Sequence, residues 1–88
     1  MPTIAQFHGI SIYMFMEIGQ PHRLPHFHVY YGEYTASFAI DPPTLLEGLL
    51  PRRQMRLVLA WAELNQEELQ ANWERVQRGQ TPLRIQGI

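Results

Sequence analysis

Residues 25–34, with the sequence PHFHVYYGEY, constrain the fold more than any other stretch of this chain. They combine aromatic and β-branched residues, which favour a strand. Alternation along a strand sends Phe27 and Val29 to one face and His26 and His28 to the other. The stretch therefore predicts a strand that supplies a core with one face and a candidate site with the other.

Gly32 and Glu33 follow this strand and predict a two-residue type II′ turn, because the first turn position needs a positive φ that glycine adopts without strain. The turn joins strands 26–31 and 34–40 and fixes their register. Six cross-strand pairs follow from it: Tyr31 with Tyr34, Tyr30 with Thr35, Val29 with Ala36, His28 with Ser37, Phe27 with Phe38, and His26 with Ala39.

The N-terminal part of the chain predicts a first hairpin. Residues 3–7 and 10–17 are apolar and rich in strand formers, and His8-Gly9 between them suits a type I′ turn because both residues tolerate positive φ. Residues 18–25 contain two prolines and a glycine, so they predict a loop that leads to the second hairpin.

The C-terminal half predicts two helices. The first covers residues 52–64 after Pro51, and the second covers residues 66–78 after a capping box formed by Asn65 and Glu68. Helical spacing predicts buried positions in both: Met55, Leu57, Val58, Leu59, Trp61, Ala62, Leu64, Leu69, Trp73 and Val76.

Residues 44–50 are predicted to be a connector, and residues 81–88 an extended tail. The elements together predict an α+β fold, a four-strand antiparallel meander with two C-terminal helices packed on one face. A chain of 88 residues has the length of one domain, so residues 1–88 are expected to form a single one.

Composition excludes some classes of function. The chain has no cysteine, so neither a disulfide nor thiolate chemistry is expected. No charged start followed by an apolar run is present, so neither a signal peptide nor a membrane span is expected, which favours a bacterial cytoplasmic protein. The net charge of −1 argues against binding nucleic acid by bulk electrostatics, so RNA would need a local basic patch.

One face of the predicted sheet is left uncovered by the helices. Solubility alone would favour Lys and Glu on such a face, whereas this one carries aromatic, imidazole and hydroxyl groups, so we expect it to be a binding or reactive surface. His26, His28 and Tyr30 are the candidate catalytic residues, because imidazole transfers protons near neutral pH. The residues of the face are Tyr13, Phe15, His26, His28, Tyr30, Thr35, Ser37 and Asp41.

The histidines allow two other interpretations. His26 and His28 lie two residues apart on one strand face, and His22 lies on the preceding loop, so the three imidazoles could hold zinc or nickel. Alternatively, His26 and His28 are structural strand residues that hydrogen-bond to Tyr30, to Ser37 or to each other. A protein without a cofactor remains the first expectation.

Arg52, Arg53 and Arg56 fall in the first turns of the first predicted helix, where the helix dipole disfavours cations. Together with Tyr13 and Ser37 they are candidates for contacting phosphate or a partner. The alternative is a set of surface ion pairs with nearby carboxylates, for which the candidates are Asp41, Glu47 and Glu63.

Several short motifs in the chain are similar to those of a known protein family. They are residues 1–4 (MPTI), 25–28 (PHFH), 31–32 (YG), 56–64 (RLVLAWAEL), 67–69 (EEL) and 72–73 (NW). In these motifs the sequence resembles the domain of unknown function family 4160, over nearly the whole chain. The resemblance implies no established activity, but it implies a two-gene module in which the partner is a small protein encoded by the adjacent gene.

A fainter resemblance is to HicA-type mRNA interferases, in which a histidine-bearing strand, a hairpin, a leucine-rich connector and a helix follow in this order. His26 or His28, the Gly32 hairpin, Leu49-Leu50-Pro51 and the Arg52 helix occupy these places. It implies a component of a toxin-antitoxin-like pair that acts on RNA or on a partner protein. The alternative is a non-catalytic protein-binding or metal-binding module that uses the same face, and a homodimer stays open.

Overall fold

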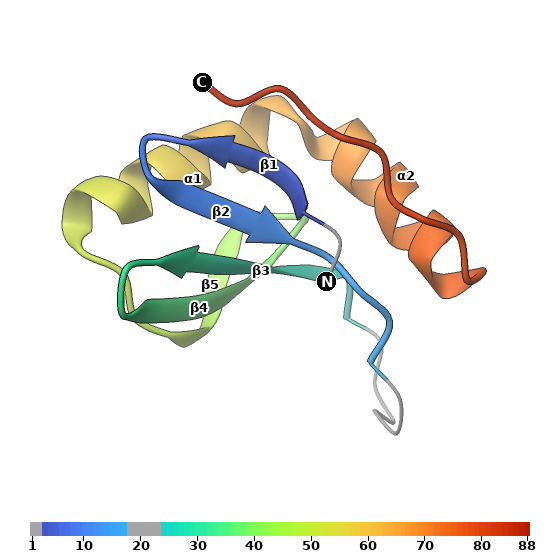
Figure 1. Ribbon diagram of the computed structural model, residues 1–88, viewed down its shortest axis with the longest axis horizontal. Helices are drawn as coiled ribbons and strands as arrows, with labels where there is room; N and C mark the ends of the chain where they lie inside the picture. Colours follow the sequence, from blue (N-terminus) through green and yellow to red (C-terminus); the bar gives the residue numbers. More distant parts are fainter. Residues whose placement is uncertain (1–2, 18–23) are drawn as a thin grey trace.

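The computed structural model describes residues 3–17 and 24–88, and its fold is α+β. Five antiparallel strands form one sheet in the order β1-β2-β3-β4-β5, and two helices follow (Figure 1). No helix in the described ranges is long and apolar enough to cross a membrane. The elements are β1 (Thr3–Phe7), β2 (Ile10–Tyr13), β3 (His26–Tyr31), β4 (Tyr34–Ala39), β5 (Thr44–Gly48), α1 (Arg52–Leu64) and α2 (Gln66–Gln77).

Both hairpin turns confirm the sequence prediction. His8 and Gly9 have φ values of 50° and 77°, the two positive values that a type I′ turn requires. Gly32 has a φ of 57°, as the first position of the predicted type II′ turn needs. All six predicted pairs between β3 and β4 are present, so the two faces of β3 are those that the alternation predicted.

The predicted connector 44–50 was wrong over most of its length, because it contains β5. This strand pairs with β4 from Thr44 opposite Ala39 to Gly48 opposite Ala36. All five of its residues are exposed, so it has no buried face and shows no alternation of apolar and polar residues. The sheet is therefore a five-strand meander instead of the predicted four-strand one.

The second predicted strand was too long. β2 ends at Tyr13 instead of at residue 17. Tyr13 pairs with Thr3 on one side and with His28 on the other, and Thr3 is the first residue of β1. Beyond Tyr13 no β1 residue remains to pair with, so residues 14–17 are not part of the strand ladder. The side chain of Glu17 can therefore lie over the sheet instead of within it.

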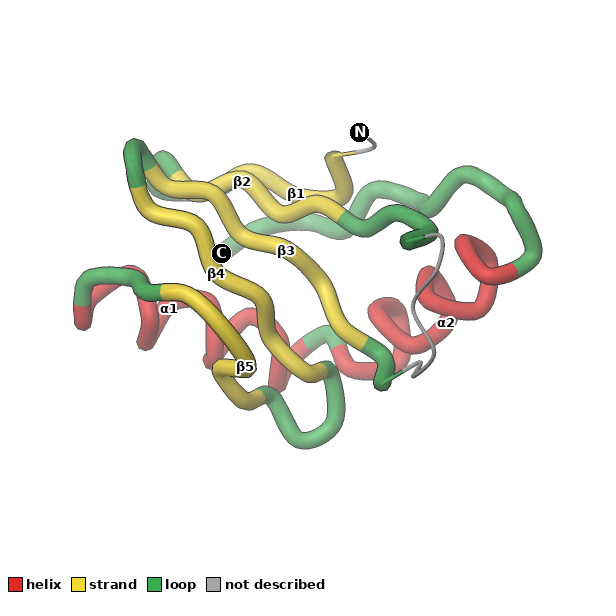
Figure 2. The backbone as a smooth tube through the Cα atoms, turned by 90° about the horizontal axis from the view of Figure 1, so that it is seen from below, coloured by secondary structure: helices red, strands yellow, loops and turns green. Residues whose placement is uncertain are grey.

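The core lies between the sheet and the helices (Figure 2). Phe27 and Phe38 stack with ring centroids 5.6 Å apart, and Trp61 of α1 meets Phe27 edge to face at 5.8 Å. From α2, Leu69, Trp73 and Val76 are buried, as predicted. The remaining large side chains that are fully buried are Ile4, Ile10, Ile12, Met14, Val29, Ile40 and Val58.

Two helix predictions were wrong in detail. Leu64, the last residue of α1, was expected to be buried but is 70% exposed. Asn65 forms no side-chain cap on α2. Its amide instead donates to the carbonyl oxygen of Trp61 at 2.8 Å, which satisfies the last turn of α1.

The tail 81–88 is extended and runs along both helices to the edge of β1 (Figure 1). Ile85 is 7% exposed and belongs to the core. Five hydrogen bonds hold the tail: Asn72 Nδ2 to Leu83 O (2.8 Å), Leu83 N to Asn72 Oδ1 (2.8 Å), Trp61 Nε1 to Gln86 O (2.9 Å), Arg75 Nε to Thr81 O (2.9 Å) and Ile85 N to Ile4 O (2.7 Å).

Candidate functional site

The strand register lines up a row of polar side chains across the sheet. Tyr13 of β2 lies opposite His28 of β3, His28 opposite Ser37 of β4, and Ser37 opposite Glu47 of β5. These positions alternate with the buried ones, so their side chains lie on the face that the helices leave uncovered. We call this the open face.

A shallow depression of about 340 Å³ lies on the open face. A second depression of about 240 Å³ adjoins it and shares His28, Ser37 and Glu47. Among the described residues, the titratable side chains that line them are the carboxylates of Glu17 and Glu47, the imidazoles of His26 and His28, and the phenol of Tyr30. The lining residues of the first are Glu17, Leu24, His26, His28, Ser37, Leu46 and Glu47.

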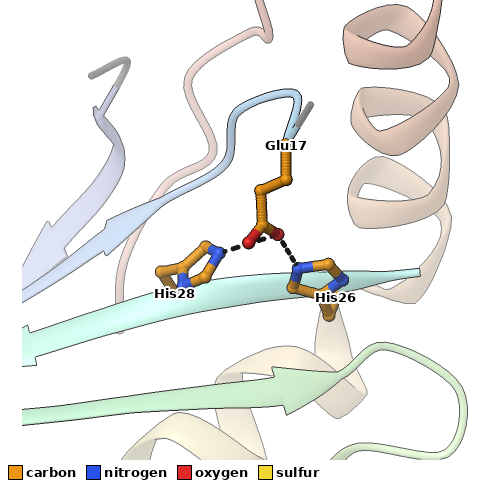
Figure 3. Close-up of side chains that lie close together, drawn as sticks. All are labelled: Glu17, His26 and His28. Carbon is orange, nitrogen blue, oxygen red and sulfur yellow. Dashed lines mark hydrogen bonds and ion pairs between the residues drawn. The ribbon is translucent and has the colours of Figure 1, made fainter. Parts of the chain in front are cut away.

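Glu17 joins the two strand histidines into one cluster (Figure 3). Its Oε1 contacts Nε2 of His26 and lies 3.3 Å from Nε2 of His28. One ligand atom from each residue lies within 4.8 Å of the others. We refer to Glu17, His26 and His28 as the Glu-His cluster.

His26 is held from two sides. Its Nδ1 lies 2.7 Å from the carbonyl oxygen of Leu24, which can only accept, so Nδ1 carries a hydrogen and donates it. Its ring also packs against the indole of Trp73 on α2, with centroids 5.2 Å apart. The local chain and the second helix therefore fix the direction in which Nε2 points.

His28 is held by stacking. Its ring lies on that of Phe15, with centroids 4.5 Å apart and planes 14° from parallel. The ring of His26 meets it edge-on at 5.1 Å. Phe27, between the two histidines, is fully buried, so the backbone that carries both is anchored in the core.

The pKa of the Glu17 carboxyl lies below its ordinary value of 4.5. Partial burial raises this pKa, but the hydrogen bonds and the electrostatic attraction from His26 and His28 together lower it by more. Glu17 is therefore ionised at neutral pH and faces the two imidazoles as a carboxylate.

The structure brings some of the predicted site residues together and separates others. Tyr13 and Tyr30 meet edge to face at 5.0 Å beside the Glu-His cluster, and Ser37 lines both depressions. In the described part of the chain neither histidine hydrogen-bonds to Tyr30 or Ser37, so the predicted structural hydrogen bonds were wrong and Glu17 takes their place. His22 falls outside the described residues.

The arginines lie elsewhere. Arg52, Arg53 and Arg56 are exposed at the start of α1, which begins at the end of the sheet where both hairpin turns lie, whereas β3 begins at the other end (Figure 1). None of them lines either depression. The ion pairs predicted with Asp41, Glu47 and Glu63 are absent from the described residues.

The sequence prediction missed Glu17 as a site residue. The signal was present, because alternation from Tyr13 through Phe15 sends Glu17 to the same face as the histidines. Glu47 was weighed only as an ion-pair partner, since its strand was not predicted. The register with Ser37 now places it on the open face.

An antiparallel sheet with two covering helices and a Glu-His cluster on its open face defines a small α+β domain with a candidate ligand site. The family model of the domain of unknown function DUF4160 matches residues 9–74, a range that contains all three residues of the cluster. Since this is more than half of the chain, the protein belongs to that family. No curated protein and no solved structure matches it significantly, and the comparisons give no support to the resemblance to HicA-type mRNA interferases.

Proposed function

We propose that this protein is a binding module whose open face contacts a small partner protein, the product of the adjacent gene in a toxin-antitoxin-like pair. The observation that carries the proposal is an uncovered aromatic surface. Tyr13 and Tyr30 pack together on this face, and Tyr30 keeps 36% of its surface exposed although it lies on a central strand. Tyrosines in such positions are enriched at protein interfaces and often dominate their binding energy.

Charge favours a protein over RNA as the partner. The depressions beside the tyrosines are lined by the carboxylates of Glu17 and Glu47, which repel phosphate. The three arginines at the start of α1 would have to lie beside the histidines to hold an RNA backbone there, and they lie at the other end of the sheet. Catalysis by His26, His28 and Tyr30 stays a prediction.

Tyr30 and Tyr34 allow a matched test. Both lie on the β3–β4 hairpin with similar exposure, 36% and 41%, but Tyr34 pairs with Tyr31 and lies on the opposite face of the sheet. We expect Tyr30→Glu to lower recovery of the adjacent gene's product in co-purification by about tenfold or more, because truncating a central interface tyrosine removes a dominant contact. Tyr34→Glu should leave recovery unchanged. Equal recovery with both variants, or no co-purification with the natural sequence, would contradict the proposal.

The toxin-antitoxin-like role has a separate test in growth. Each gene of the pair is expressed alone and together under an inducible promoter, and growth is followed. We expect expression of one partner alone to slow growth and co-expression to restore it. Unchanged growth in every combination would contradict this role without affecting the binding result.

A further inference from the structure

Three side chains that can each offer a ligand atom to a metal ion converge at the Glu-His cluster. Nδ1 of His26 gives its hydrogen to the Leu24 carbonyl, so the neutral ring turns the lone pair of Nε2 toward Glu17. The carboxylate of Glu17 has only lone pairs to offer, and Nε2 of His28 lies 3.3 Å from the same oxygen. Two groups that can only accept, the Glu17 carboxylate and Nε2 of neutral His26, repel each other at contact distance unless a positive species lies between them, whereas His28 can carry its hydrogen on either ring nitrogen. The geometry therefore calls for a cation, either a proton or a metal ion.

We propose that Glu17, His26 and His28 bind a divalent first-row transition-metal ion. The donors are Nε2 of each histidine and a carboxylate oxygen of Glu17, which lie within 4.8 Å of one another. Coordination places such donors about 2.0–2.2 Å from a shared ion. Glu17 lies beyond the end of β2, outside the ladder, so its side chain can rotate to close this geometry without disturbing a strand pair.

The donor set selects the class of ion. Two imidazoles and one carboxylate suit zinc, iron, nickel or cobalt, whereas calcium and magnesium favour sites made of oxygen. Glu17 supplies the third ligand among the described residues, and its carboxylate lowers the net charge of the bound site; His22 of the sequence-based set lies outside those residues. The inference does not depend on the proposed partner.

The surroundings of the cluster resemble the outer shell of a metal site. The hydrogen bond from Nδ1 of His26 to the Leu24 carbonyl orients Nε2, as such contacts do for metal-bound histidines. Phe15 and Trp73 hold the two rings by stacking and packing. The donor atoms are thus oriented before an ion arrives, which reduces the ordering cost of binding.

The site would keep an open coordination position. Three protein ligands leave at least one position of a tetrahedral ion free. Glu17 reaches the histidines from the end of β2, so the free side faces the depression toward β4 and β5, which Ser37, Leu46 and Glu47 line. That position is accessible to water or to a donor atom of a bound molecule.

Zinc alone is the probe for the test. The full chain is stripped with a chelator, its affinity tag is removed, and zinc is titrated by calorimetry at neutral pH. We expect one zinc ion per chain, and a melting temperature that rises with free zinc concentration as mass action requires. Cobalt in place of zinc should give visible absorption bands whose intensity reports a site of low coordination number.

Glu17→Gln and Glu47→Gln form the decisive pair. Each removes one negative charge from the same depression, but only Glu17 belongs to the cluster. We expect Glu17→Gln to weaken zinc binding by more than about tenfold, because an amide is a poor replacement for a carboxylate ligand. Glu47→Gln should change the affinity less than about threefold, and His28→Gln should resemble Glu17→Gln. Circular dichroism checks that each variant is folded.

Two outcomes would overturn the inference. Equal losses in Glu17→Gln and Glu47→Gln would show that zinc responds to the local charge instead of to coordination. Unchanged melting of the natural sequence with saturating zinc would show that the cation of the cluster is a proton. The titration contains no partner protein, so its failure is distinguishable from a failure of the co-purification.

Discussion

Glu17 connects a segment outside the strand ladder to two histidines on a central strand, and this contact predicts a pH dependence. Its pKa in the folded protein is below 4.5, so the contact stabilises the fold above pH 4.5, and this contribution is lost as the pH falls from there through the folded-state pKa. Glu17→Gln removes the contribution. The free energy of unfolding of the variant should therefore decrease less steeply below pH 4.5 than that of the natural sequence, as measured by urea unfolding with a chelator present.

The control for this measurement is Glu33→Gln, which also removes one carboxyl group but at the exposed turn of the second hairpin. It should leave the slope of the natural sequence unchanged. Parallel pH profiles for Glu17→Gln and the natural sequence would mean that the contact contributes nothing to stability in solution.

The residues of the site could be predicted only where strand alternation applies. His26 and His28 lie on a strand with a clear buried face, so their own face was predictable. Glu17 follows three residues that are not in the ladder, so alternation indicated its face, but the loop that separates it from His26 has no periodicity from which its contacts with the histidines could be inferred. Its contacts depend on where β2 ends, which is decided by the start of β1.

Secondary-structure elements, like site residues, were predictable only where the sequence carries a side-chain pattern or a turn signal. The two hairpins carry turn residues with a strict need for positive φ, and α1 carries a strong apolar stripe, so all three were predicted within a few residues. β5 buries no side chain and depends only on backbone pairing with β4. Backbone pairing is independent of side-chain pattern, so nothing in the sequence of Thr44–Gly48 indicated a strand.

The position of Gly48 allows a prediction of how strongly β5 depends on close backbone contact with β4. It has a φ of 91°, and an added Cβ would lie 2.2 Å from the carbonyl oxygen of Thr35. Gly79 after α2 has a similar φ of 77° but open space at its Cβ position. We expect Gly79→Ala to cost about 1 kcal/mol of stability from the positive φ alone. Gly48→Ala should cost at least about 1 kcal/mol more, because β4 and β5 must move apart.

Urea unfolding of the two variants measures these costs. Hydrogen exchange should also show faster exchange in β5 of Gly48→Ala but not of Gly79→Ala. Equal destabilisation by both substitutions would mean that β5 relaxes without losing its contact with β4.

At the scale of the whole molecule, the tail (residues 81–88) contacts three elements that are distant from one another in the sequence. It bonds to the indole of Trp61 in α1, to the side chain of Asn72 in α2 and to the edge of β1, and Ile85 fills the space among them. Asn72 precedes Trp73, whose ring packs on His26, so the element that the tail secures is also the one that supports the Glu-His cluster. The tail therefore belongs to the framework of the site.

Ile85 and Leu83 test this role of the tail. Both are large apolar residues of the tail, but Ile85 is 7% exposed and Leu83 is 60% exposed. Truncating a buried isoleucine costs about 2–5 kcal/mol through lost burial and a residual cavity, so Ile85→Ala should lower the melting temperature by about 8 °C or more. Leu83→Ala keeps the backbone bonds to Asn72 and should change the melting temperature by less than about 4 °C. If calorimetry shows both variants melting at the same temperature as the natural sequence, the tail does not contribute to folding. In that case α2 must be held by its own contacts with the sheet.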